Sequence, residues 1–409
     1  MAKMAICRKV KGGVCSAKGF RAAGVAAGIK YKDRKDVALI VADAPCAAAA
    51  MFTTNAVAAA PVVFDRSIVK YGCAQAILAN SGCANACTGA EGLRDAVESV
   101  KATAATLGVD PRHVFVASTG VIGRRLPLKR LLSGMKEAAK NLDSTPQAGL
   151  DAELAVMTTD TRPKQAAVKV RILGHDVTIG GMCKGSGMIE PNMATMLGFI
   201  TTDCSIAPGM LRNALKSAVV RGFNRVVVDG DQSTNDSVFI MASGAAGNKE
   251  IRHPDASFRL FRDALIQLIV NLAKQMAADG EGATKFVTVK VKGAATERDA
   301  ELAARAIAKS PLCKTSWYGK DPNWGRVLAA VGYSGAKIDA SKAEVFYGKT
   351  WAYKQGKVAD GAQLKKLEAE LAGSEVTVTV DLHFNNRETE IYTCDFSNEY
   401  VHINADYTT

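Results

Sequence analysis

The sequence predicts a layered α/β or α+β fold, because strand patterns and helix patterns are mixed along all 409 residues. Hydrophobic residues make up 48% of the chain, which is enough to fill the core of two lobes or of one large layered unit. No fixed-period repeat is visible and no long Pro/Ser linker divides the chain, so composition alone gives no domain boundary.

Strands are predicted where apolar residues alternate with polar ones. Alternation at 168–172 and 177–179, on either side of Gly174 and His175, predicts a hairpin that leads into the glycine-rich region 181–187. The same alternation predicts further strands at 287–291 and 376–382.

Helices are predicted between these strands, at 93–107, 128–142, 209–222, 257–278, 297–309 and 361–372. The 257–278 segment carries Arg259, Arg262, Asp263 and Lys274 among its leucines, so it is too charged for a membrane span. We expect one amphipathic face of this helix to pack on a sheet.

The formal net charge of +12 is compatible with nucleic acid, a membrane surface or acidic metabolites as partners. The basic residues are dispersed, however, aromatic residues make up only 6%, and no RNA-binding aromatic motif is present. A nucleic-acid or protein-binding module therefore ranks far below an enzyme, and we expect no nucleic-acid partner and no membrane partner.

Cysteine and histidine usage gives no support for a metal site. The ten cysteines form no CxxC pair, and the five histidines are scattered, so a Ser-His-Asp arrangement has no support either. The first residues, Met1 to Lys11, are short, basic and interrupted, unlike a secretory leader. We therefore expect a cytoplasmic protein with reduced thiols.

The most informative stretch is residues 184–203, KGSGMIEPNMATMLGFITTD, which places an Ala194–Thr195 bond in a Gly- and Met-rich segment. A threonine hydroxyl is a poor nucleophile unless a base lies beside it. If the bond before it is cut, the new α-amine, with a pKa near 7.7–8.0, supplies that base. From its local sequence alone, an ordinary Ala-Thr pair in a turn or strand is the more common alternative.

The remaining motifs change that balance. They occur, in order, as GFRAAGVAAGIK at 19–30, FTTNAVAAAPV at 52–62, NSGCANACTG at 80–89, STGVIG at 118–123, TTDTRPK at 158–164, the central stretch, DGDQSTNDS at 229–237, DPNWGR at 321–326 and the terminal NADYTT. In these motifs the chain resembles the glutamate N-acetyltransferase, or ornithine acetyltransferase, family of arginine biosynthesis, whose members cut themselves before a nucleophilic threonine. Cys83 and Gln232 depart from the pattern, since we expect an amide residue at the first position and a small hydroxyl residue at the second.

The resemblance implies two sheets sandwiched between helices, a fold related to that of the self-cleaving aminopeptidases. It also implies a cut between Ala194 and Thr195. The products are an α chain of residues 1–194 and a β chain of residues 195–409, which stay intertwined in one layered unit. Two copies of each chain are expected, as a heterotetramer.

The resemblance also assigns the site. Thr195 is the nucleophile, and the Thr119 hydroxyl and Gly120 amide form the oxyanion hole at the end of a predicted strand. The implied substrate contacts are Thr158, Lys184, Thr195, Glu281, Asn404 and Thr409. For Thr158 the neighbours Thr159 and Thr161 stay open. The acidic and hydroxyl-rich 229–237 motif is interpreted as a hydrogen-bonded turn supporting the site.

The implied activity moves acetyl from N2-acetyl-L-ornithine to L-glutamate through an acetyl-threonine, in ping-pong order. No cofactor is implied, and acetyl-CoA stays open as a second acetyl donor. The alternative enzyme is a self-processing aminopeptidase or amidohydrolase with the same threonine and with water as the acceptor.

Overall fold

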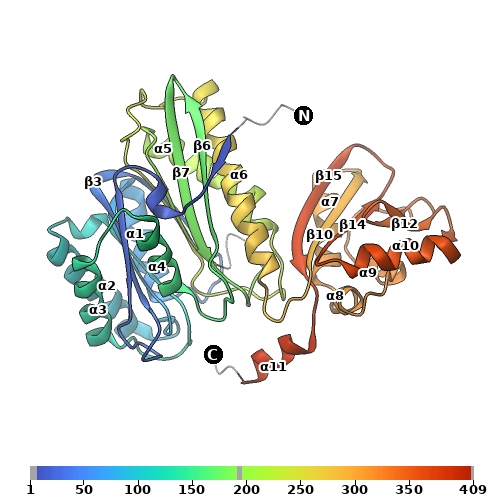
Figure 1. Ribbon diagram of the computed structural model, residues 1–409, viewed down its shortest axis with the longest axis horizontal. Helices are drawn as coiled ribbons and strands as arrows, with labels where there is room; N and C mark the ends of the chain where they lie inside the picture. Colours follow the sequence, from blue (N-terminus) through green and yellow to red (C-terminus); the bar gives the residue numbers. More distant parts are fainter. Residues whose placement is uncertain (1–6, 191–195, 407–409) are drawn as a thin grey trace.

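The structure is a computed structural model that describes residues 7–190 and 196–406. It has two lobes, each built around one sheet (Figure 1). The strands of the larger lobe are β1 (Arg8–Val10), β2 (Phe20–Val25), β3 (Val37–Phe52), β4 (Cys73–Asn80), β5 (Val114–Ser118), β6 (Gln165–Ile172), β7 (His175–Lys184), β8 (Leu197–Thr202) and β9 (Ser237–Ala242). Its helices are α1 (Ala60–Ile68), α2 (Gly89–Leu107), α3 (Leu128–Lys140), α4 (Pro146–Val156), α5 (Pro208–Arg221) and α6 (Ala256–Ala278).

The nine-stranded sheet of this lobe folds back on itself through the long strand β3. Strand β3 pairs with β4 from Val37 to Ala47, with a shift of register between Val41 and Cys46. Its first part, from Val37 to Ala42, also pairs with β2, and its last part, from Ala47 to Phe52, pairs with β9. The strand order is β1-β6-β7-β8-β9-β3-β4-β5, with β2 paired to β3.

The two halves of the folded sheet pack face to face. Phe115 on β5 and Phe199 and Phe239 on β8 and β9 share one buried core. The ring centroids of Phe115 and Phe239 are 5.2 Å apart, within the usual range for packed aromatic pairs.

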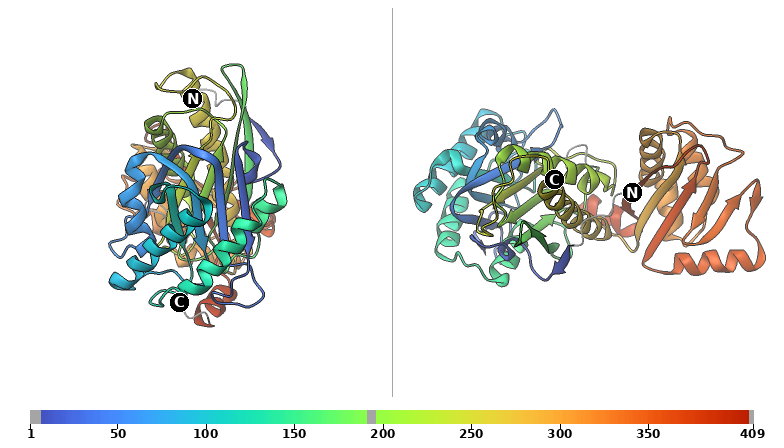
Figure 2. Two further views of the ribbon diagram at one scale, coloured as in Figure 1. Left: turned by 90° about the vertical axis from the view of Figure 1, so that its left-hand side faces the viewer. Right: turned by 90° about the horizontal axis from the view of Figure 1, so that it is seen from above.

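Helices cover both outer faces. Val100 of α2 and Leu131 of α3 pack on the half that contains β4 and β5, while Leu215 of α5 and Leu268 of α6 pack on the half that contains β6 to β9. Figure 2 shows these helices on either side of the strands. The expectation of two sheets sandwiched between helices is confirmed, with the addition that β3 joins the two halves into one hydrogen-bonded sheet.

The smaller lobe holds a six-stranded sheet in the order β13-β12-β11-β14-β10-β15, in which β10 runs parallel to β14. Val289, Val378 and Ile391 point into a core that Ile307 and Trp317 close from the helices. Its elements are β10 (Phe286–Ala294), α7 (Glu297–Lys309), α8 (Pro311–Tyr318), α9 (Trp324–Gly332), β11 (Glu344–Tyr347), β12 (Thr350–Lys354), β13 (Lys357–Val358), α10 (Gly361–Ala372), β14 (Glu375–Asp381), β15 (Arg387–Cys394) and α11 (Asn398–Asp406). Helix α11 leaves this lobe and runs back beneath the larger one (Figure 1).

The predicted hairpin is confirmed as β6 and β7, and the 257–278 helix as α6. None of the helices among the described residues is long and apolar enough to cross a membrane. Strand β7 ends at Lys184, which lies opposite Leu197, the first residue of β8. The connection between them carries the predicted cut, but Ala194 and Thr195, like Thr409, lie outside the described residues.

Candidate active site

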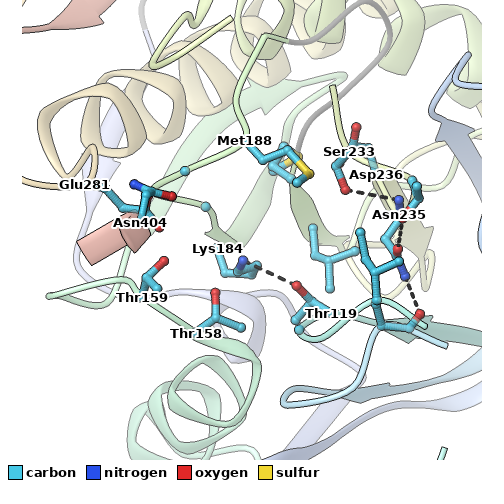
Figure 3. Close-up of a pocket in the computed structure, with 18 residues that line it drawn as sticks. Thr119, Thr158, Thr159, Lys184, Met188, Ser233, Asn235, Asp236, Glu281 and Asn404 are labelled. Carbon is cyan, nitrogen blue, oxygen red and sulfur yellow. Dashed lines mark hydrogen bonds between the residues drawn. The ribbon is translucent and has the colours of Figure 1, made fainter. Parts of the chain in front are cut away.

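A cavity of about 110 Å³ lies where the ends of β5 and β7 meet the start of β8 and the loop before β9 (Figure 3). It contains six of the residues that the sequence predicts for the site, namely Thr119, Gly120, Thr158, Lys184, Glu281 and Asn404. The other lining residues among those described are Ala84, Ile122, Thr159, Gly185, Gly187, Met188, Met196, Leu197, Ser233, Thr234, Asn235 and Asp236. Residues that are far apart in the sequence thus meet in one place.

Thr119 and Gly120 follow directly after β5. The Thr119 backbone N–H donates to Asn80 O at 3.0 Å, which continues the β4–β5 pairing by one residue. Gly120 has a φ of 125°, and a Cβ there would lie 2.5 Å from the carbonyl carbon of Gly82. Both the backbone angle and the close approach therefore require glycine at position 120.

Lys184 ends β7 with its ammonium inside the cavity. The residue is only 8% exposed, and its Nζ donates to Thr119 Oγ1 at 3.4 Å. Burial lowers the pKa of Lys184, since it outweighs the nearby carboxylates of Asp160, Glu281 and Asp236. The Asp160 carboxylate is 4.0 Å from the Lys184 ammonium, at the limit of an ion pair.

Asp160 connects several parts of the site, a role that the sequence analysis missed. Its carboxylate accepts hydrogen bonds from Thr158 N at 3.0 Å, Gly185 N at 2.7 Å and Lys164 Nζ at 2.6 Å. Burial opposes its ionisation, but the Lys184 and Lys164 ammonium groups outweigh burial, and the pKa of Asp160 is lowered. Lys164 also contacts Asp279 at 2.5 Å. The signal was present in the TTDTRPK motif, which contains both Asp160 and Lys164.

The three threonines of that motif have different positions. Thr158 and Thr159 both line the cavity, and the Thr159 hydroxyl shares a hydrogen bond of 2.7 Å with the Ser186 hydroxyl. The Thr161 hydroxyl is bonded to the Asp279 carboxylate instead. Of the three threonines of this motif, Thr158 and Thr159 thus face the cavity.

Glu281 and Asn404 form another wall of the cavity. Asn404 Nδ2 donates to Glu281 Oε2 at 2.9 Å, which holds α11 against the cavity. The Glu281 carboxylate lies directly over Gly187, where a Cβ would come within 2.3 Å of Glu281 Oε2. The structure thus places Asn404 in the site, as the sequence predicts, although a role in substrate binding stays a prediction.

The 229–237 motif contributes four lining residues, Ser233 to Asp236. Asn235 Nδ2 donates to Ala84 O at 2.6 Å and to Ser118 O at 2.8 Å, so it supports the turn beside Thr119. Asp236 is only 2% exposed, and sequence analysis missed it as a separate candidate. Its position in an acidic and hydroxyl-rich motif was the available signal.

The two departures from the family pattern lie outside the cavity lining. Cys83 is buried, forms an antiparallel bridge with Thr119 and donates from Sγ to Arg124 O at 3.4 Å. Gln232 O accepts from Asn55 Nδ2 at 3.2 Å. Within residues 7–190 and 196–406, no group of three His, Cys, Asp or Glu residues could hold a metal ion.

Comparison with known proteins finds relatives over nearly the whole sequence. The sequence model of the ArgJ family matches residues 21–409. The chain is 50% identical over 402 residues to the arginine biosynthesis bifunctional protein ArgJ of Symbiobacterium thermophilum, covering 97% of this chain and 99% of that protein. It is 46% identical over 392 residues to the protein of the same name from Geobacter sulfurreducens, covering 96% and 99%.

A solved structure is also similar. The crystal structure of the arginine biosynthesis bifunctional protein ArgJ from Bacillus halodurans aligns with a TM-score of 0.50 and 41% identity, covering 52% of this chain and 100% of that one. Because the family match spans nearly the whole sequence and the Symbiobacterium protein is identical at half of the aligned residues, this chain belongs to the ArgJ family of arginine biosynthesis.

Proposed function

We propose that this protein is a bifunctional acetyltransferase of arginine biosynthesis. It moves the acetyl group of N2-acetylornithine to glutamate and also accepts acetyl from acetyl-CoA. The observation that carries this proposal is the cavity, in which Lys184, Glu281 and the Thr119–Gly120 turn meet beside the start of β8. The relatives are named as bifunctional arginine biosynthesis proteins, which supports both activities.

Thr195 is the nucleophile of this proposal. Met196 and Leu197 both line the cavity, and Met196 O accepts a hydrogen bond from Ser237 N at 2.9 Å. Since consecutive Cα atoms are about 3.8 Å apart, the residue before Met196 can reach the same space. After a cut between Ala194 and Thr195, the new α-amine takes the hydroxyl proton and activates the nucleophile.

The two chains made by this cut, 1–194 and 195–409, stay together because they share the sheet. Strand β8 lies between β7 on one side and β9 on the other, and β9 pairs with β3. Every one of these contacts except β8–β9 joins a segment before the cut to a segment after it. Separating the chains would expose the aromatic core between the two sheet halves.

The cavity offers one polar group for each part of an amino-acid substrate. The Lys184 ammonium attracts a carboxylate, and the Glu281 carboxylate, oriented by Asn404, attracts an amine. Thr158, and Thr409 beyond the described residues, are the further substrate contacts of this proposal. The Thr119 hydroxyl and the Gly120 amide stabilise the oxyanion of each tetrahedral intermediate, where one such donor is worth ~3 kcal/mol.

Acetylornithine acetylates Thr195 and leaves as ornithine, and glutamate then takes the acetyl group in the same cavity. This order is ping-pong. Two copies of each chain form the heterotetramer in this proposal, and the ten cysteines, all free, fit a reducing cytoplasm.

The test follows labelled acetyl. The purified protein should consist of fragments that begin at Met1 and Thr195 by mass spectrometry, and label from acetylornithine should appear in acetylglutamate. Thr195→Ala should abolish both cleavage and transfer, whereas Thr195→Ser should keep part of each, because it keeps a hydroxyl. Uncut wild-type protein refutes the proposal. If label goes to water at a rate that excess glutamate does not change, the protein is a hydrolase instead.

A further inference from the structure

The cavity is too small to hold a whole molecule of acetyl-CoA. Its volume is about 110 Å³, whereas sites that enclose drug-sized ligands measure roughly 300–1,000 Å³. Only the acetyl thioester end of this donor therefore fits between Thr119, Lys184 and Glu281. The nucleotide end, which carries the phosphate groups and the adenine, must lie on the surface beside the cavity.

The surfaces around the cavity differ in charge. The exposed Asp231 comes just before the lining residues Ser233 to Asp236, and Glu281 lies on another wall. Carboxylates on these sides repel phosphate groups. Next to Thr158, in contrast, lies the loop 26–36 between β2 and β3, with the sequence AAGIKYKDRKD.

Loop 26–36 adjoins the cavity. Its residues Lys30, Tyr31 and Arg34 line a narrow crevice together with Gly82 and Thr158. Thr158 also lines the cavity itself (Figure 3). The crevice measures only about 10 Å³, so a nucleotide can lie across it but not inside it.

Close packing of the backbone fixes the loop beside the proposed oxyanion hole. A Cβ on Gly82 would lie 2.8 Å from Lys30 Cβ, and a Cβ on Gly120 would lie 2.5 Å from the carbonyl carbon of Gly82. Lys30, Gly82 and Gly120 are thus stacked directly on one another. The base of the Lys30 side chain lies one backbone layer away from the turn that we propose as the oxyanion hole.

Hydrogen bonds hold the shape of the loop. Asp36 is only 3% exposed, and its carboxylate accepts from Ala27 N at 2.6 Å and from Ile29 N at 2.5 Å. From the neighbouring helix α3, Arg130 Nη1 donates to Gly28 O at 2.6 Å. The loop therefore presents its side chains from an ordered backbone, which lowers the entropy cost of binding a ligand.

Two cationic groups of the loop surround one exposed aromatic ring. Lys30 Nζ lies 5.2 Å and Arg34 Cζ lies 6.0 Å from the centroid of the Tyr31 ring, and Tyr31 is 46% exposed. Lys35 is instead paired with Asp151 at 2.6 Å. Ammonium and guanidinium groups bind phosphate, and an exposed aromatic ring offers a surface to a base.

We propose that loop 26–36 binds the nucleotide end of acetyl-CoA, with Lys30 and Arg34 on its phosphate groups and Tyr31 against its adenine. This inference rests on the proposed function, in which acetyl-CoA is an acetyl donor. It adds the site that distinguishes this donor from acetylornithine. Acetylornithine carries neither phosphate nor adenine, so it needs the cavity alone.

The test compares the two donors in the same variants. In ping-pong order, kcat/KM for a donor reports the steps before glutamate enters. Lys30→Ala and Arg34→Ala should each lower kcat/KM for acetyl-CoA roughly tenfold, because each removes a charged contact with phosphate. Tyr31→Ala should lower it by roughly the same factor, because it removes the ring from the adenine. All three should keep kcat/KM for acetylornithine within about threefold of wild type.

Two further measurements separate the nucleotide from the thioester. Acetyl-pantetheine carries the same thioester without the nucleotide, so the three variants should use it as well as wild type does. Added salt should lower kcat/KM of wild type more steeply for acetyl-CoA than for acetylornithine, because salt screens exposed phosphate contacts.

Lys70→Ala and Tyr71→Ala are the matched controls. Lys70 Nζ lies 5.5 Å from the centroid of the Tyr71 ring, which belongs to a residue that is 52% exposed. Neither is among the described residues that line the cavity or the crevice. Both variants should keep the wild-type kcat/KM with both donors. Lys30→Gln and Arg34→Gln, which remove the charge but keep most of the length, replace an alanine variant that shows no cooperative melting.

Three results overturn the inference, and they can be told apart. If wild type accepts acetyl from acetyl-CoA and the loop variants match the Lys70 and Tyr71 controls, the loop does not bind the nucleotide and the proposed function stands. If the variants lose kcat/KM equally with acetyl-CoA, acetyl-pantetheine and acetylornithine, the loop only supports the cavity. If wild type uses acetylornithine but not acetyl-CoA, the acetyl-CoA activity of the proposed function fails together with this inference.

Discussion

Replacing Gly120 with alanine is the sharpest test of the oxyanion hole. The Gly120 amide is one of its two proposed donors, and the φ of 125° already disfavours any side chain. A Cβ at this position would lie 2.5 Å from the carbonyl carbon of Gly82 and 2.7 Å from the backbone nitrogen of Cys83. Both are backbone atoms, which cannot move away as the end of a flexible side chain can. The Gly120 amide must therefore shift.

Gly123 provides the reference for this change. It lies in the same loop with a φ of 78°, but a Cβ there meets nothing within 4 Å. Alanine at either position costs about 1–3 kcal/mol of stability for the backbone angle. Only at Gly120 does it also displace an amide that we propose as an oxyanion donor, and losing such a donor lowers kcat by roughly 100- to 1,000-fold.

The assay measures kcat and KM for acetyl transfer from acetylornithine to glutamate with both variants, after mass spectrometry has established the fraction cut. We expect Gly123→Ala to keep the wild-type kcat, and Gly120→Ala to lose roughly 100-fold or more in kcat with little change in KM, because the donor acts in the transition state. If kcat of the cut Gly120→Ala protein stays within about threefold of that of Gly123→Ala, the assignment of the Gly120 amide is wrong.

Three further predictions concern stability, cleavage and binding. The pKa of Glu153 is raised from 4.5 to about 7 by burial, so the stability that its neutral form provides is present below pH 4.5 and is lost as the pH rises through about 7. Denaturant unfolding should show that the free energy of unfolding falls by up to ~3 kcal/mol across this pH window in wild type and does not fall in Glu153→Gln. If the free energy of unfolding changes equally with pH in both proteins, burial does not raise the pKa of Glu153. Asp229 accepts hydrogen bonds from Met188 N at 2.6 Å and Ile189 N at 2.8 Å. Asp229→Ala should release this segment before the predicted cut and slow cleavage roughly tenfold. If mass spectrometry shows an unchanged time course of cleavage, Asp229 does not have this role. Asn404→Ala removes the amide that orients Glu281, so steady-state kinetics should give a KM roughly tenfold higher with kcat kept, whereas an unchanged KM would mean that α11 does not shape the binding site.

Local pattern was sufficient to predict much of the fold. The hairpin of β6 and β7 and the helices α6, α7 and α10 follow from periodicities that depend on neighbours two to four residues away. The sequence did not indicate that β3 would change partners in its middle and join two halves of one sheet. That bend depends on which strands lie beside β3, and those strands come from distant parts of the chain.

The sequence likewise predicted some residues of the site and missed others. Thr119, Lys184 and Glu281 could be named because each lies in a motif of the family, and the structure brings them together as expected. Asp160 and Asp236 were missed because their importance comes from burial and from their partners. A carboxylate in a polar motif is usually solvated, and only tertiary packing decides which one loses its water.

The net charge of +12 gave little information about the site. The sequence of opposite charges along the cavity wall, in contrast, explains how the buried Lys184 can remain available to a substrate. Along the wall the signs alternate from Lys184 to Asp160, Lys164 and Asp279. Asp160 is already bonded to Lys164 at 2.6 Å and lies 4.0 Å from Lys184, too far for a hydrogen bond. Lys184 is therefore stabilised by a nearby carboxylate without being neutralised by direct contact. A substrate carboxylate that approaches within hydrogen-bonding distance would be its closest partner, and the desolvation of the site makes that attraction stronger than it would be in water.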